Sequence, residues 1–178
     1  MNDTLTNSIG NQMELLARLG MELQKPLDEL ANACATSLLS GGKLILISDS
    51  ESQYCQNLLS HLLSKGEIVE RPTLPMLSIH TETSNTGSPN IDMLEHLYQP
   101  DDIIILIARD AQQIDTSLIH ADQRRHTICA HTPQPTNSPN TLGLTVTNRS
   151  QWLTASTLLC NLLVQQIEQR LFGLTPHE

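Results

Sequence analysis

Apolar residues recur at helical spacing through the N-terminal segment of the chain. In residues 4–20 they return every three or four positions, which predicts an amphipathic helix that ends at Gly20. A second helix is predicted to begin near Pro26, a residue favoured in the first helical turn, and to end at Gly41-Gly42. We therefore predict a pair of N-terminal helices ahead of the first strand.

The rest of the chain alternates between short apolar runs and stretches of helical spacing. Apolar runs bounded by turn residues predict buried strands at residues 43–47, 74–79, 103–108, 127–131 and 142–146. Helical spacing predicts helices at residues 55–65, 91–98, 112–125 and 150–172. Polar, turn-rich stretches predict loops at 81–90 and 133–140, and the interval 141–149 is open to either strand or loop.

This order of elements predicts an α/β fold. Alternating strands and helices pack as a parallel sheet, because each crossover helix must bury its apolar side against the sheet. We predict a doubly wound, Rossmann-like parallel sheet flanked by helices, with one domain over residues 1–178 and the α/β sandwich over residues 43–172. A chain of this length with 39% hydrophobic residues can bury one sizeable core.

Composition and charge narrow the classes of function. The formal net charge is −9 and four residues are aromatic, so the chain would repel a phosphate backbone and offers few rings to stack on bases. We therefore expect no direct binding to nucleic acid, whereas a basic protein partner is allowed. The four cysteines form no C-x-x-C pair and are predicted to be reduced, buried thiols.

Targeting signals and catalytic motifs are not recognised. No basic, apolar leader is visible and the longest apolar run, residues 103–108, is too short to span a membrane, so we expect a cytoplasmic protein with no membrane partner. The seven histidines form no H-x-x-x-H pair, and neither a G-x-S-x-G nor a Walker loop is present. We predict no metal, no cofactor and no catalytic residue.

A resemblance to a known family rests on two stretches of sequence. Residues 41–48 read GGKLILIS and residues 61–75 read HLLSKGEIVERPTLP, which resembles the strand, helix and RP-x-x-P segment of the phosphoheptose isomerase branch of SIS-domain proteins. Within that branch, Glu70-Arg71-Pro72 is similar to the DnaA initiator-associating subgroup. Asp102 and the strand after it, with Ile167-Glu168 and Leu171-Phe172 near the C-terminus, extend the resemblance over nearly the whole chain. It implies an SIS-type form of the predicted fold.

The resemblance also implies two phosphate-binding loops, and both are altered here. The family's first loop is G-N-G-G-S, whose glycines let backbone N–H groups approach a phosphate at a helix N-terminus. Here only Ser52 is kept, while Asp49 and Glu51 place carboxylates where they would repel a phosphate. The second loop has lost its hydroxyls and here contains Arg109, which could hold a phosphate by itself, although an exposed arginine beside Asp110 is more often a solvated surface pair. We treat Ser52 and Arg109 as a vestigial sugar-phosphate pocket.

Metal ligands and proton carriers of the isomerases have no equivalent in this chain. The resemblance maps their His, Glu, Gln and His onto Leu58, Leu62, Leu153 and Asn161. Aliphatic side chains can neither bind a divalent ion nor carry a proton. Asn161 matches the DnaA-associating subgroup, although that subgroup keeps the glycine loop. We therefore expect a protein that is not an enzyme.

The subgroup that this chain resembles consists of homotetramers that bind DnaA. Its contact surface includes a Leu-Phe pair, which corresponds here to Leu171 and Phe172, although these two residues could instead cap the core or an oligomer interface. The resemblance implies that residues 1–40 make oligomer contacts. We expect a homo-oligomer, implied to be a tetramer, that acts as a non-catalytic adaptor and promotes assembly of DnaA at the origin.

Two other functions stay open at this stage. A sugar-phosphate isomerase, or a sugar-phosphate sensor, would have rebuilt its pocket around Ser52 and Arg109. A purely structural oligomer would serve an unrelated partner. The first predicts stabilisation by a sugar phosphate, because a ligand of the native state raises its melting temperature. The second predicts that affinity capture finds a different protein.

Overall fold

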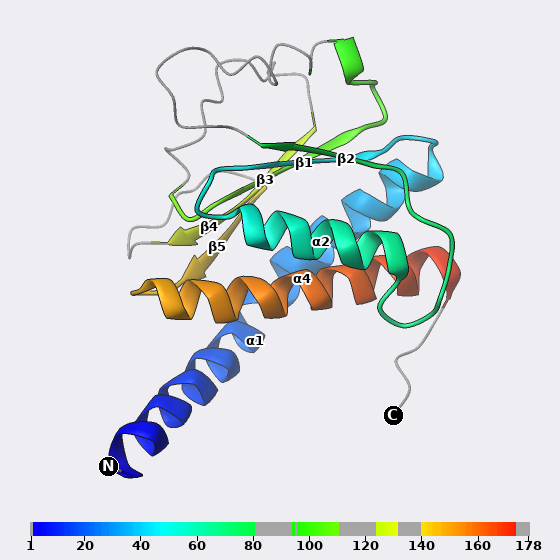
Figure 1. Ribbon diagram of the computed structural model, residues 1–178. Helices are drawn as coiled ribbons and strands as arrows, with labels where there is room; N and C mark the ends of the chain where they lie inside the picture. Colours follow the sequence, from blue (N-terminus) through cyan, green and yellow to red (C-terminus); the bar gives the residue numbers. More distant parts are fainter. Residues whose placement is uncertain (1, 81–93, 95, 111–123, 132–139, 174–178) are drawn as a thin grey trace, which may run out of the picture.

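Five parallel strands form one sheet in the spatial order β2-β1-β3-β4-β5 (Figure 1). The computed structural model describes residues 2–80, 94, 96–110, 124–131 and 140–173. The strands are β1 (Leu44–Ser48), β2 (Met76–His80), β3 (Ile103–Ala108), β4 (Arg125–His131) and β5 (Thr141–Thr145). The long helices are α1 (Asn2–Leu39), α2 (Gln53–Lys65) and α4 (Arg149–Phe172). The predicted α/β fold with a parallel sheet is confirmed.

All five strands were predicted from their apolar runs, each within two residues of the observed bounds. β3 covers the predicted residues, since every one of its six side chains is buried. The open interval 141–149 is resolved as strand β5 followed by the start of α4. Asn148 caps that helix, and its side-chain oxygen accepts a hydrogen bond from the backbone N–H of Gln151 at 2.9 Å.

The predicted pair of N-terminal helices is wrong, because α1 runs without a break through Gly20 and Pro26. A proline inside a helix removes a backbone hydrogen bond and a glycine lowers helix propensity. Both costs are offset here by burial, since the apolar stripe continues past these two residues at helical spacing. Its buried members are Leu15, Leu19, Leu23, Leu27 and Leu30.

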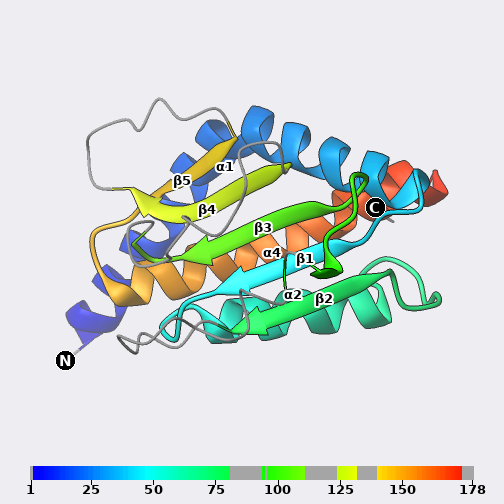
Figure 2. The ribbon, with the colours of Figure 1, turned by 90° about the horizontal axis from the view of Figure 1, so that it is seen from above.

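The two faces of the sheet are covered by different parts of the chain. Figures 1 and 2 show α1, α2 and α4 together on one face. Side chains of β1 alternate between the faces, so that Leu44 and Leu46 pack in the helical layer while Ile45 and Ile47 point to the other side. In the described part of the chain, that other side is covered by Leu94 and Tyr98.

Some predicted elements fall outside the described residues. This applies to the loop at 81–90, to residues 112–123 of the helix predicted at 112–125, and to nearly all of the loop at 133–140. Arg125, the predicted end of that helix, is the first residue of β4 and pairs with Ile104. The backbone N–H of Ile104 donates to Arg124 at 2.8 Å, so the sheet extends two residues further back than the apolar pattern indicated.

Asp102, which the family resemblance singled out, lies directly before β3 and has a structural role. Its buried carboxylate accepts the backbone N–H groups of Lys43 and Gln99, both at 2.9 Å, and pairs with the ammonium group of Lys43. These bonds tie the beginnings of β1 and β3 together. No helix in the described ranges combines the length and apolar character needed to cross a membrane.

Candidate functional site

The strand order identifies one end of the sheet as the place for a ligand. After β1 the chain forms β2 on one side of it and then crosses back to form β3 on its other side. The direction of winding therefore reverses between β1 and β3. Open α/β sheets bind ligands outside the carboxyl ends of the two strands at such a reversal. Residues 49–52 follow β1 and Arg109 follows β3, and we call this group the switch-point loops.

Ser52 and Arg109, the two residues of the predicted pocket, lie side by side in the switch-point loops. The backbone N–H of Arg109 donates to Ser52 Oγ at 3.0 Å. The guanidinium of Arg109 is turned to Glu51, with Nη1 and Oε2 3.6 Å apart and both side chains partly exposed. This is a solvated surface pair, as the alternative interpretation of Arg109 expected, but it is formed with Glu51, whereas the sequence pointed to the adjacent Asp110.

Asp49, which the sequence grouped with Glu51 as an acid that would repel a phosphate, is the buried acid of this loop. It is 1% exposed, and its Oδ1 accepts the backbone N–H of Ser52 at 2.7 Å, just before α2 begins. Its Oδ2 has no hydrogen-bond partner in the described ranges. A phosphate would seek the same N–H groups at a helix N-terminus. The Asp49 carboxyl group therefore occupies the anion position of this helix with a side chain of the protein itself.

The environment of Asp49 favours its protonated form. Burial raises its pKa, the hydrogen bonds from Ser52 oppose that rise, and the nearby Glu51 carboxylate adds to it. The sequence signal was available in outline, because an aspartate side chain commonly accepts the backbone N–H of a residue two or three positions later where a helix begins. Only burial distinguishes the roles of the two acids, since Asp49 is enclosed while Glu51 is exposed.

Replacing Asp49 with asparagine is expected to stabilise the fold progressively as pH rises. In the wild type, the folded state holds the Asp49 proton more tightly than the unfolded chain does. The stability that this proton contributes to the wild type is complete below the unfolded pKa and is lost as pH rises through the folded pKa. Asparagine has no such dependence. The free energy of unfolding of Asp49→Asn relative to wild type should rise as pH increases above the ordinary carboxyl pKa of about 4, by ~1.4 kcal/mol per unit of pKa elevation.

Urea denaturation of both proteins at several pH values measures this difference. Glu51→Gln is the matched control, because it neutralises an exposed acid in the same loop. A difference between Asp49→Asn and wild type that does not change with pH would contradict the assignment.

A second candidate surface lies at the C-terminal end of α4. The buried carboxylate of Glu168 accepts the backbone N–H groups of Glu67 and Ile68 and the Nε–H of Arg71, the last at 2.7 Å. The guanidinium of Arg71 also lies 6.0 Å from the ring centre of Phe172, within the range of a cation–π contact.

Phe172 and Leu171 therefore differ in their environment. The ring of Phe172 is 47% exposed, whereas Leu171 is partly buried and packs against the core. The helix ends directly after Phe172, because Gly173 adopts a left-handed conformation and its N–H donates to Gln169. We call Phe172, with the exposed Val69 of the segment that Glu168 holds, the α4-end patch.

Comparison with known proteins identifies the fold. No protein-family model matches the sequence, and no curated protein does so either. A phosphoheptose isomerase from Neisseria gonorrhoeae superposes with a TM-score of 0.70 at 11% identity, covering 94% of this chain and 98% of that chain. This is the SIS isomerase fold.

Two further structures support this assignment of the SIS fold. A phosphoheptose isomerase from Francisella tularensis has a TM-score of 0.62 at 16% identity and covers 95% of this chain and 98% of that chain. A Bacteroides fragilis protein proposed to be a phosphosugar isomerase involved in capsule formation has a TM-score of 0.61 at 15% identity, covering 93% of this chain and 91% of that chain. At these identities the likeness establishes the fold and leaves the activity to be argued from the site.

The residues that the sequence resemblance aligns with isomerase metal ligands do not form a donor set. Leu58 and Leu62 of α2 pack in the core, and the exposed Leu153 of α4 is aliphatic as well. Asn161 uses its amide N–H to bond the backbone of its own helix at Thr157, 3.1 Å away. Across the described ranges, no group of three His, Cys, Asp or Glu side chains is placed to hold a metal ion. These residues do not fit a catalytic metal, and we assign no reaction step to them.

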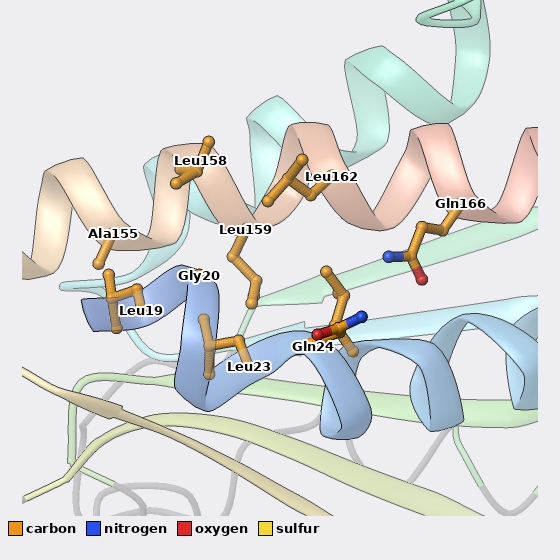
Figure 3. Close-up of a pocket in the computed structure, with 10 residues that line it drawn as sticks. Leu19, Gly20, Leu23, Gln24, Ala155, Leu158, Leu159, Leu162 and Gln166 are labelled. Atoms are coloured by element: carbon orange, nitrogen blue, oxygen red, sulfur yellow. The ribbon is translucent and has the colours of Figure 1, made fainter. Parts of the chain in front are cut away.

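An apolar groove runs between α1 and α4 on the outer side of the helical layer (Figure 3). It has a volume of about 160 Å³, and Gln24 and Gln166 contribute the two amide side chains of its lining. A shallow hollow of about 500 Å³ adjoins it, sharing Leu158 and including Leu153 and Asn161. We call the groove and the hollow together the α1/α4 face. Its apolar lining residues are Leu16, Leu19, Leu23, Leu27, Leu153, Ala155, Leu158, Leu159 and Leu162.

Proposed function

We propose that this chain is a non-catalytic SIS-fold adaptor that binds the replication initiator DnaA and regulates initiation of chromosomal replication. The observation that carries the proposal is the buried Asp49 carboxyl group at the N-terminus of α2. It takes the N–H group that an isomerase of this fold would offer to the phosphate of its substrate. Without a phosphate site, and with leucines at the metal-ligand positions, the fold is left with its outer surfaces for function.

The α4-end patch is the proposed contact for DnaA. Aromatic side chains that are partly exposed and rigidly held are typical binding hot spots. Phe172 meets both conditions, because its ring is half-exposed while Arg71 and Glu168 hold the surroundings through buried bonds. The net charge of −9 and the neighbouring Glu67 and Glu70 favour a partner segment with basic residues.

The proposed mechanism is mass action. An oligomer that holds several DnaA molecules raises their effective concentration and so promotes their assembly at the origin, without any chemical step. The full chain is expected to capture purified DnaA in a pull-down experiment at micromolar concentration. No detectable complex at that concentration would remove this function.

Self-association through the α1/α4 face is part of the proposal. The N-terminal half of α1 extends beyond the sheet in Figure 1, and its Ile9 and Met13 are 51% and 66% exposed. A second copy would cover this surface and the adjoining groove, because exposed apolar patches of this extent in soluble proteins usually mark interfaces. The family resemblance implies a tetramer.

Leu153→Glu is expected to shift the protein towards the monomer, since a carboxylate would be buried in the hollow on association. Light scattering at matched concentrations measures the change in mass. Leu97→Glu is the control: Leu97 has the same 38% exposure, but its neighbours Leu94 and Tyr98 pack on the opposite face of the sheet. Equal masses for the wild type and Leu153→Glu would place the interface elsewhere or show that the chain is a monomer.

A second candidate function is a sugar-phosphate isomerase or sensor with a rebuilt site. The fold of the three isomerases favours it, and Ser52 and Arg109 lie together at the switch-point loops. Heptose, hexose and pentose phosphates would then raise the melting temperature of the protein, because they bind its native state. If none of the three classes of sugar phosphate raised the melting temperature, the result would favour the adaptor function.

A further inference from the structure

Two buried thiols meet between α2 and α4. Cys55 lies in the first turn of α2 and Cys160 in the middle of α4, with their sulfur atoms 3.2 Å apart. Both residues are 0% exposed and both thiols are free. Cys160 Sγ also lies 3.7 Å from the backbone oxygen of Cys55, so the contact involves the same two residues twice.

A neighbouring hydrogen bond holds the two helices in this register. Tyr54, the residue before Cys55, shares a bond of 2.6 Å with Ser156 Oγ, one turn before Cys160 on α4. Burial raises the pKa of Tyr54 to about 12, so this hydroxyl keeps its proton at neutral pH. The Tyr54–Ser156 bond and the sulfur contact together prevent α2 from sliding along α4.

We propose that Cys55 and Cys160 form a redox-responsive dithiol that a hydroperoxide converts into a disulfide. One thiolate attacks the peroxide oxygen, giving a sulfenic acid and, with hydrogen peroxide, one hydroxide that takes up a proton to become water. The second sulfur then attacks the sulfenic sulfur and displaces a second water. Two thiols lose two electrons and two protons, the peroxide is reduced to two waters, and the sulfurs move about 1 Å closer to reach disulfide length.

The same geometry explains why the dithiol would react slowly and selectively. The hydrogen bond with Cys55 raises the pKa of Cys160, and burial raises it further, so little thiolate is present at neutral pH. Access requires local opening of the α2–α4 contact, which excludes bulky reagents. Once one sulfur is oxidised, the other is already within reach, and this proximity favours closure over further oxidation.

Closure would link two parts of the molecule that carry the candidate surfaces. Cys55 lies three residues after Ser52 of the switch-point loops, and Cys160 lies on the helix that ends at Phe172. The disulfide would also connect positions more than a hundred residues apart, which restricts the unfolded chain strongly. We therefore expect the oxidised protein to melt at a higher temperature, by about 5 °C or more.

Oxidation of the wild-type chain followed by peptide mass mapping tests the proposal. After hydrogen peroxide treatment at mildly alkaline pH, we expect a Cys55–Cys160 crosslinked peptide, an intact mass lower by two hydrogens and a raised melting temperature, all reversed by dithiothreitol. Oxidation of either cysteine to sulfinic acid without the crosslink would overturn the proposal. So would a crosslink that involves Cys34 or Cys129, the other two buried thiols.

The variants Cys160→Ser and Cys160→Ala remove one partner while keeping a small side chain. Neither is expected to gain thermal stability on peroxide treatment, whereas Cys34→Ser should gain as much as the wild type. If both Cys160 variants fail to fold, the mass mapping of the wild type still decides the outcome. A gain in stability in a folded Cys160 variant would contradict the assignment.

Discussion

Replacing Glu168 with alanine is expected to destabilise the protein by about 3–5 kcal/mol, the cost of removing one partner of a buried ion pair. The change leaves the Arg71 guanidinium, whose side chain is 4% exposed, without its carboxylate. It also removes the acceptor for the backbone N–H groups of Glu67 and Ile68, the second of which is bonded at 2.7 Å. Urea denaturation of the wild type and the variant measures the difference in the free energy of unfolding.

A matched control is another ion pair that involves α4. Arg170 pairs with Asp28 of α1, but the side chain of Asp28 is 64% exposed, so Asp28→Asn should cost no more than about 1 kcal/mol. The double variant Arg71→Met with Glu168→Leu removes both charges and should recover part of the lost stability. A loss below about 1 kcal/mol for Glu168→Ala would show that the buried pair does not hold the segment after α2.

Replacing Phe172 with alanine is expected to weaken binding to DnaA by at least about tenfold, because a rigidly held aromatic side chain carries a large share of the energy in interfaces of this type. The fold should remain intact, since the ring is 47% exposed and lies at the last helical residue before Gly173. Binding of purified DnaA to immobilised full-length protein measures the affinity, and urea denaturation measures the stability.

The control for Phe172→Ala is Leu97→Ala, which truncates an exposed apolar side chain beside Tyr98, a residue that packs on the face of the sheet opposite α4. This control is expected to bind DnaA as the wild type does. A large loss of stability in Phe172→Ala would favour the alternative in which Leu171 and Phe172 cap the core. Unchanged affinity together with unchanged stability would remove Phe172 from the binding surface.

Strand positions followed from the sequence because their signal is local. A fully buried parallel strand must be apolar on both faces, and residues 103–108 show this directly. The same local reasoning failed at Gly20 and Pro26, where the residues favour a helix end but the structure continues α1. The sequence there did contain the relevant signal, because the leucine stripe keeps its helical spacing across both positions. How much that stripe stabilises a continuous helix depends on which part of the protein covers it.

The sequence predicted which residues form the candidate site, but not what each of them does. Ser52 and Arg109 were paired by the resemblance, and they are in contact. Asp49 and Glu51 were grouped as two equivalent acids, whereas one is enclosed beneath the α2 N-terminus and the other meets Arg109 at the surface. Exposure of a loop side chain depends on the packing around it, which a sequence motif does not specify.

Glu168 shows the same limit more strongly. The resemblance matched it only as part of the family's helical C-terminus and gave it no structural role, yet it holds three groups from a segment about one hundred residues earlier. The contact between Cys55 and Cys160 is separated by 105 positions and was equally invisible.

By itself, then, the sequence determined the strands and their order along the chain, the net negative charge with few aromatic residues, and the aliphatic character of Leu58, Leu62 and Leu153. These depend on residue type and near-neighbour spacing. The tertiary structure decided which acid is buried, which arginine is paired and which sulfurs touch. Such contacts arise only when distant segments pack together, because burial changes the energy of a charge or a thiol far more than its sequence neighbours do.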